Sequence, residues 1–155
     1  MNFSKLTLDY AAEFLRGWPM DGGLELDHPI NAGQQLAIGD LVKTVVVAGV
    51  TKVTKTVAGD ATAAIGRRAG IVVRGNADEK SSAEIGKAVI LWGNYIVRTT
   101  KFDTANITAA GVNVVAGADG KFVPASTATE DSLGHVIEYR AAAGGRPAEI
   151  VVVVK

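Results

Sequence analysis

The side chains with the clearest catalytic chemistry lie within five residues of one another: Asp131, Ser132 and His135. An acid, a hydroxyl and an imidazole are the components of a hydrolytic triad, in which histidine activates serine and the acid orients histidine. The flanking residues are typical of a polar turn that leads into a strand, and they lack the pattern of a strained elbow that exposes a nucleophile. We therefore interpret Ser132 and His135 as structural. A small hydrolase remains a hypothesis, which loss of activity in Ser132→Ala would support.

The rest of the sequence holds no recognisable set of metal or cofactor ligands. The chain has no cysteine, and its second histidine, His28, is far from His135, so no metal-ligand spacing is present. Gly86-Lys87 is followed by Ala88, where a phosphate-binding loop requires serine or threonine. We interpret Arg67-Arg68 as a solvated basic pair. These observations predict a binding or structural protein that is not an enzyme and carries no cofactor and no metal.

Charge and hydropathy argue against nucleic-acid and membrane partners. The chain of 155 residues has 16 basic and 16 acidic side chains, whereas general nucleic-acid binding needs a basic excess to neutralise phosphates. The longest apolar runs, residues 45–50 and 150–154, are far shorter than the ~20 residues that cross a bilayer. We therefore expect no direct contact with nucleic acid or with a membrane.

From residue 38 onward, short runs of β-branched residues alternate with glycine, aspartate and asparagine turns. Such runs suit the pleated, half-buried surface of a sheet, and the turn residues tolerate the backbone angles of tight corners. The predicted strands are residues 41–47, 50–57, 69–74, 86–92, 95–100, 110–115, 121–124, 133–140 and 148–154. Many short strands at roughly even spacing predict an all-β domain, a small β-barrel or β-sandwich, over residues 38–155.

Two of these strand pairs allow more detailed predictions. The apolar run at residues 150–154 is predicted to be an inner strand, because a bare apolar edge would aggregate. Gly93-Asn94 separates two apolar runs and is typical of a two-residue hairpin turn. Trp92 and Tyr95 would then form a cross-strand aromatic pair beside that turn.

Residues 1–37 differ in composition and are predicted to form an N-terminal arm. They hold four of the nine aromatic residues and two of the four prolines. Residues 7–16 are predicted to form a short helix, with Thr7 as its N-cap and Gly17 after its last turn. Residues 17–33 follow no hydrophobic period and are predicted to form an extended loop.

Four short stretches and the final apolar run of the domain over residues 38–155 match a known pattern. They are Ile38-Gly39-Asp40-Leu41-Val42, Gly70-Ile71-Val72-Val73, Gly86-Lys87-Ala88-Val89 and Leu133-Gly134-His135-Val136-Ile137, followed by residues 150–154. Through these stretches the domain resembles the small β-rich decoration, or cement, proteins of tailed-phage heads. The resemblance implies a compact barrel or sandwich that binds the exterior of the phage head in the virion, after assembly in the host cytoplasm. It further implies that the major capsid protein is the partner, and that a homo-oligomer, a trimer or dimer at a symmetry axis, clamps neighbouring capsid subunits.

On this reading, the apolar residues of the arm anchor the protein to the capsid or to a sister subunit. They are Phe3, Leu6, Leu8, Tyr10, Phe14, Leu15 and Trp18.

A recognition module, such as the glycan- or receptor-binding head of a phage fibre, is the alternative function. In that case Trp92 and Tyr95 would offer a platform on which sugars stack. Glycan-array binding would support this alternative, and co-sedimentation with expanded capsids would support the decoration protein.

Overall fold

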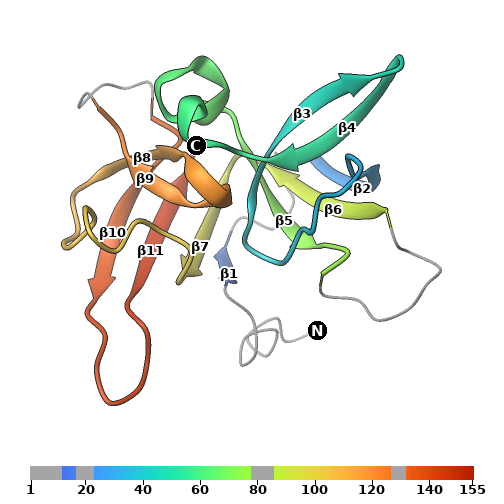
Figure 1. The fold of residues 1–155 in the computed structure, drawn as a ribbon. Coiled ribbons are helices and arrows are strands. Elements are labelled where there is room, and N and C mark those ends of the chain that lie inside the picture. Colours follow the sequence, from blue (N-terminus) through green and yellow to red (C-terminus); the bar gives the residue numbers. More distant parts are fainter. Residues whose placement is uncertain (1–11, 17–22, 78–85, 127–131) are drawn as a thin grey trace.

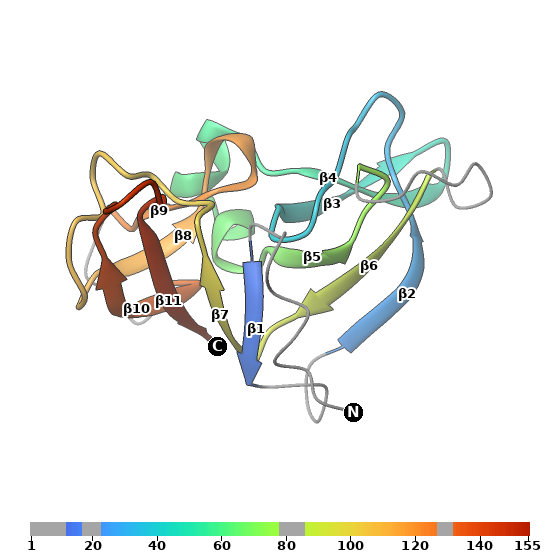
Figure 2. The same cartoon turned by 90° about the horizontal axis from the view of Figure 1, so that it is seen from below.

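The computed structural model describes residues 12–16, 23–77, 86–126 and 132–155. These residues form two antiparallel β-sheets, one of six strands and one of five, with only short 3-10 helices between them. The two sheets lie side by side in both views (Figures 1 and 2). The prediction of an all-β fold is therefore confirmed.

The first sheet supplies most of the residues in the larger of two apolar clusters. Its strands, in spatial order, are β1 (Ala12–Arg16), β7 (Tyr95–Thr99), β11 (Glu149–Val154), β10 (Gly134–Arg140), β8 (Asn113–Ala116) and β9 (Phe122–Pro124). Strand β11 lies between β7 and β10, so the predicted inner position of residues 150–154 is confirmed. Alternate side chains of β11, those of Ile150, Val152 and Val154, are buried in the core of this sheet.

The second sheet is built from the strands that precede β7 in the sequence, apart from β1. In spatial order they are β2 (Gly23–Pro29), β6 (Lys87–Trp92), β5 (Gly70–Arg74), β3 (Leu41–Val47) and β4 (Val50–Lys55). Two 3-10 helices, η2 (Ala58–Thr62) and η3 (Ala64–Arg67), connect β4 to β5, and η4 (Ala118–Gly120) connects β8 to β9. The segment at residues 61–66, whose sequence suits either a helix or a strand, is thus helical over most of its length.

Each sheet bends back toward its own far edge through one isolated parallel bridge. Ile30, after β2, bridges to Val53 of the edge strand β4, and the Asn31 N–H donates to the Val53 carbonyl at 2.8 Å. Phe102, after β7, bridges to Phe122 of the edge strand β9 in the same way. The buried apolar residues form two clusters. The larger joins residues of the first sheet to Leu41, Ile71 and Leu91 of the second, and the smaller lies within the second sheet. The smaller cluster consists of Ile30, Leu36, Val42, Val53, Val72, Ala88 and Ile90.

The described part of residues 1–37 contributes one strand to each sheet. The helix predicted for residues 7–16 is wrong over Ala12–Arg16, because β1 pairs antiparallel with the edge of β7. A sheet edge offers a row of backbone donors and acceptors, and pairing with it outweighs a weak local preference for helix. The loop predicted for residues 17–33 is wrong over Gly23–Pro29, where β2 pairs with β6. Residues 1–11 and 17–22 lie outside the described residues.

The hairpin predicted at Gly93-Asn94 is also wrong, although both flanking strands exist. Gly93 and Asn94 have positive φ angles of 70° and 49°, as a tight turn requires. However, β6 belongs to the second sheet and β7 to the first, so the turn is a corner between sheets. Trp92 packs against the smaller cluster and Tyr95 lies in the larger one, so the two rings do not form a cross-strand pair. The two strands predicted at residues 110–115 and 121–124 are present as β8 and β9, which pair antiparallel.

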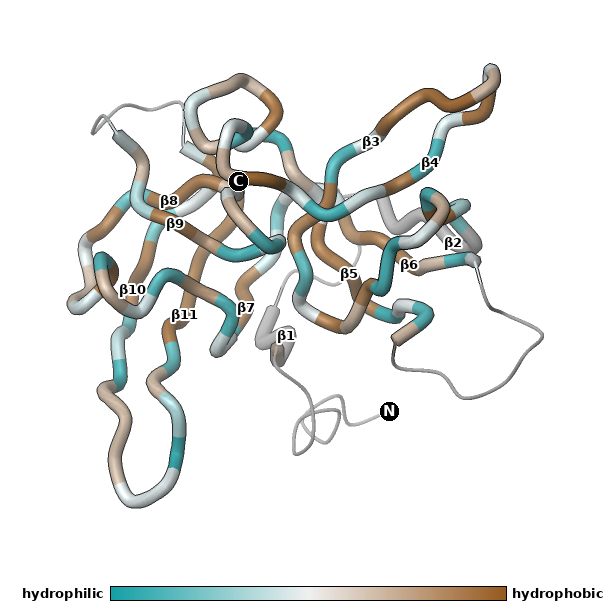
Figure 3. The backbone as a smooth tube through the Cα atoms, viewed as in Figure 1, coloured by the Kyte–Doolittle hydropathy of each residue, from teal (hydrophilic) through white to brown (hydrophobic). Residues whose placement is uncertain are grey.

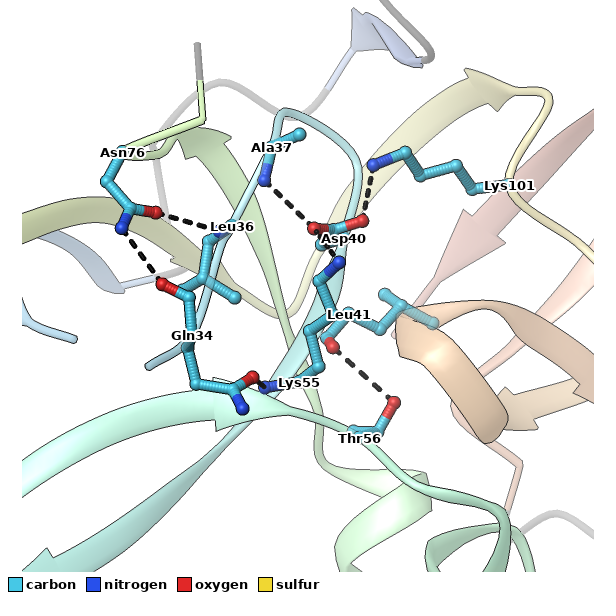
Figure 4. Close-up of polar contacts among 9 residues, drawn as sticks. All are labelled: Gln34, Leu36, Ala37, Asp40, Leu41, Lys55, Thr56, Asn76 and Lys101. Carbon is cyan, nitrogen blue, oxygen red and sulfur yellow. Dashed lines mark hydrogen bonds and ion pairs between the residues drawn. The ribbon is translucent and has the colours of Figure 1, made fainter. Parts of the chain in front are cut away.

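A buried carboxylate at Asp40 links the two sheets (Figure 4). Its side chain is 2% exposed and forms ion pairs with Lys101, which follows β7, and with Lys55, which ends β4, at 3.2 Å. The Ala37 N–H donates to the same carboxylate at 2.9 Å. Because Lys101 extends from the first sheet and Lys55 from the second, Asp40 holds both sheets to the start of β3.

The loop before β3 closes the smaller cluster by inserting Leu36, which is fully buried. The side-chain oxygen of Asn76 accepts a hydrogen bond from the Leu36 N–H at 2.8 Å. The side-chain amide of Asn76 donates to the Gln34 carbonyl at 2.9 Å (Figure 4). The Ala77 N–H donates to the Leu36 carbonyl at 2.9 Å. The chain after β5 therefore holds this loop through three hydrogen bonds, and Gly75 lies directly against it.

A turn around Asp103 gives a prediction about pH. The Asn106 side-chain amide donates to Asp103 at 2.7 Å, and the backbone N–H groups of Ala105 and Asn106 donate at 3.1 and 3.3 Å. These hydrogen bonds, that of the Asn106 side chain first, hold the pKa of Asp103 below its ordinary value.

We expect Asp103→Ala to reduce the free energy of unfolding by about 1 kcal/mol at pH 7. Because the folded pKa is lowered, this stabilisation exists above the unfolded pKa of about 4 and is lost as pH falls through the folded value. Urea unfolding of wild type and variant at pH 7 and near pH 3 checks the prediction. A stability gap of the same size at both pH values would contradict it.

Candidate protein-binding surface

The structure gives His135 a structural contact. His135 is half-buried in β10, and its Nδ1 lies 2.9 Å from the Oδ1 of Asn113 in the neighbouring strand β8. Ser132 is buried, with 8% of its surface exposed, and Asp131 lies outside the described residues. Within residues 12–16, 23–77, 86–126 and 132–155, no group of three or more histidine, aspartate or glutamate side chains gathers as metal ligands would. The hydrogen bond to Asn113 joins two strands, as the interpretation of His135 as a strand residue expects.

The predicted arm residues are only partly placed by the structure. Phe14 and Leu15 belong to β1 at the edge of the first sheet, where the backbone of Phe14 pairs with that of Val97. Phe3, Leu6, Leu8, Tyr10 and Trp18 lie outside the described residues. Anchoring through these seven residues stays a prediction.

Tyr95 does not provide the platform that sugar stacking would need. Its side chain is 1% exposed and packed in the larger apolar cluster. Burial raises the pKa of the Tyr95 hydroxyl far above its ordinary value, so the ring stays neutral at any physiological pH. Only Trp92, which is half-buried, retains some access to solvent. The structure therefore removes the paired aromatic surface on which the glycan-binding alternative depended.

The most exposed large apolar side chain of the described residues, that of Val46, lies at the tip of the β3–β4 hairpin, next to two further exposed valines. Val46, Val47 and Val50 are 71%, 40% and 48% exposed. The hairpin projects away from both sheets in Figure 1, and its outer half is coloured as hydrophobic in Figure 3. Isolated exposed apolar residues are ordinary, but a contiguous exposed group marks a surface for binding another molecule. We define residues 45–51 as the hairpin tip.

The local sequence builds this hairpin as a regular two-stranded ribbon. Ala48 and Gly49 have positive φ angles of 50° and 77°, which match the right-handed twist of the strands in a two-residue turn. Val47 pairs with Val50, and the register continues without a bulge to Val42 and Lys55. At the base, Val42 and Val53 are buried in the smaller cluster.

An ion pair also fixes the base of the hairpin to helix η2. Lys43 Nζ lies 2.7 Å from Oδ1 of Asp60, which is itself 6% exposed. The other carboxylate oxygen of Asp60 accepts the Val57 N–H at 2.7 Å. The base of the hairpin is therefore fixed by the smaller cluster and by the ion pair, and the hairpin tip projects from this fixed base.

A second projection, the loop between β10 and β11, offers less apolar surface. Residues 141–147 are all exposed and consist of alanine, glycine, arginine and proline, with Ala143 and Arg146 bridged across the turn. These small side chains bury little area in a contact, and area buried is what drives apolar association. The hairpin tip is therefore the stronger candidate for a binding site.

Comparison with known proteins adds no assignment to this geometry. No protein-family model matches the chain, and no curated protein matches it. In the part of the chain that the structure describes, no helix combines the length and the hydropathy of a membrane span.

Proposed function

We propose that this protein is a decoration protein of a tailed-phage head, which binds the outer surface of the shell and clamps neighbouring major capsid subunits. The observation that carries the proposal is the projecting hairpin tip with three exposed valines. A contiguous apolar group on an all-β body is suited to gripping another protein. The sequence resemblance of residues 38–155 supplies the identity of that protein.

The stretches that carry the resemblance lie in the body of the fold. They form the entry to β3, most of β5, the start of β6, the first half of β10 and most of β11, with the buried Asp40 in the first of them. In this proposal the shared stretches build the rigid scaffold, and the projecting segments supply the contacts with the shell.

The mechanism is thermodynamic. A protein that binds the expanded shell, and not its dissociated subunits, stabilises the shell by mass action against the pressure of packaged DNA. Many copies, each a homo-oligomer at a symmetry axis, gain avidity even when single contacts are weak. We propose a trimer or a dimer as the binding unit, located on the exterior of the virion.

Co-sedimentation with purified phage shells tests the proposal. We expect the protein to pellet with expanded shells, to saturate at a fixed ratio to the major capsid protein, and to raise the temperature at which the shells break. Light scattering of the free protein should give the mass of a dimer or trimer. Binding to a glycan array without binding to shells would replace the proposal with the recognition module.

A further inference from the structure

We propose that the hairpin tip is the capsid anchor, and that it enters an apolar pocket of the major capsid protein whose rim carries carboxylates. The inference rests on the proposed function and names its contact. It also shifts the main contact from the predicted arm residues to residues 45–51.

The arrangement of side chains on the hairpin favours a pocket over a flat surface. Cross-strand pairs alternate between the two faces of the ribbon, with Val46 opposite Thr51 on one face and Val47 opposite Val50 on the other. Val46, Val47 and Val50 are all exposed, so both faces of the tip are apolar and uncovered by the described residues. A site that surrounds the tip removes both faces from water, whereas a flat site would cover only one.

The hairpin is also prepared for insertion before it meets a partner. Its turn is tight, its register is regular, and its base is held by the Lys43–Asp60 ion pair and by the buried Val42 and Val53. The tip therefore loses little conformational entropy when it binds. Such a loss of entropy is one of the main free-energy costs of association.

The charge of the hairpin indicates which side chains the rim of the capsid pocket should carry. The fifteen residues from Leu41 to Lys55 include Lys43, Lys52 and Lys55 and no acidic residue. Lys43 is paired with Asp60 and Lys55 with Asp40, while Lys52 forms no ion pair within the described residues. Lys52 lies opposite Val45, on the same face as Val47 and Val50. A carboxylate beside the pocket would complement this ammonium group.

The same charge argues against a second hairpin as the occupant. Two tips packed face to face through Val47 and Val50 would place the Lys52 of each copy in the same interface. Like charges that face each other across an interface weaken it and select against that pairing. The observations therefore favour an acidic-rimmed pocket of another protein over self-association through the tip.

The shell co-sedimentation assay compares variants of the hairpin-tip valines with control variants of similarly exposed apolar residues elsewhere. The double variant Val46→Asp/Val50→Asp should lower shell affinity by at least about tenfold. It removes two apolar groups from the contact and would place unpaired charges in the apolar pocket. Val57→Asp and Ile137→Asp change side chains of similar exposure, 53% and 51%, outside the hairpin and should bind as wild type does. The near-isosteric pair Val46→Thr/Val50→Thr should give a smaller loss with unchanged folding.

Charge and arm variants complete the test. Lys52→Glu should weaken binding at low salt and remove most of its salt dependence, whereas deletion of residues 1–11 should leave the tip contact in place.

Wild-type protein that fails to pellet with shells would overturn the proposed function itself. Wild-type binding with undiminished binding by both double variants would overturn only the inference. Conversion of a wild-type oligomer to monomers by Val46→Asp/Val50→Asp, with shell binding by the monomer unchanged, would assign the tip to self-association and also overturn it.

Discussion

Replacing Asp40 with alanine is expected to lower the free energy of unfolding by about 3 kcal/mol. The carboxylate of Asp40 is 2% exposed and is paired with Lys55 and Lys101. Removal of one partner from a buried ionic group leaves the remaining charges and donors uncompensated. The side chains of Lys55 and Lys101 are 33% and 20% exposed, so both retain some contact with water, and we expect the lower end of the range for buried pairs.

Thermal and urea unfolding of Asp40→Ala measure this effect, and an exposed ion pair provides the control. Arg140 and Glu149 lie 2.7 Å apart with side chains 46% and 23% exposed, and Arg140→Ala should cost less than about 1 kcal/mol. Because Asp40 links both sheets, its variant should unfold at lower denaturant as a whole, by circular dichroism and by tryptophan fluorescence alike. Equal, small effects in Asp40→Ala and Arg140→Ala would contradict a structural role for the buried carboxylate.

Gly75→Ala is expected to destabilise the protein by about 2–3 kcal/mol by pushing apart the loop that closes the smaller cluster. A Cβ atom at residue 75 would lie 2.0 Å from the carbonyl oxygen of Leu36 and 2.5 Å from its carbonyl carbon. Both are backbone atoms, so no side-chain rotation relieves the overlap. The loop must move, and with it the buried Leu36 side chain and its hydrogen bonds to Asn76 and Ala77.

Gly59→Ala is the matched control for this prediction. Nothing lies within 4 Å of a Cβ atom built at Gly59, and its φ is not in the left-handed region. Alanine there should be neutral or slightly stabilising, because it reduces the freedom of the unfolded chain. Urea unfolding of both variants gives the comparison, and a Gly75→Ala protein as stable as Gly59→Ala would show that the loop is not closely packed.

Most strands could be predicted from the sequence because their signals are local. The β-branched run of β11 and the glycines that interrupt such runs, as at Gly49 and Gly120, predict strand positions without knowledge of their neighbours. Strands β1 and β2 were not predicted, since residues 12–16 and 23–29 become strands only by pairing with β7 and β6, whose paired residues lie at least 58 positions further along the chain.

The candidate site shows the same division. The run Val45-Val46-Val47 predicts a strand, but three consecutive valines place apolar groups on both faces and do not say whether either face is covered. The structure leaves Val46 and Val47 exposed because the hairpin extends beyond the cluster that buries Val42 and Val53. A break in the alternation of apolar and polar residues was the one sequence signal that pointed to this segment.

The all-β class, most strand positions and the inner place of residues 150–154 follow from local sequence patterns, because β-branched periodicity and turn chemistry act between near neighbours. Three features emerge only in the folded chain: β6 and β7 separate into different sheets, Asp40 joins those sheets, and the valines of the hairpin tip face water. These features depend on which distant strands pair and which surfaces they cover, and no local pattern in the chain encodes that choice.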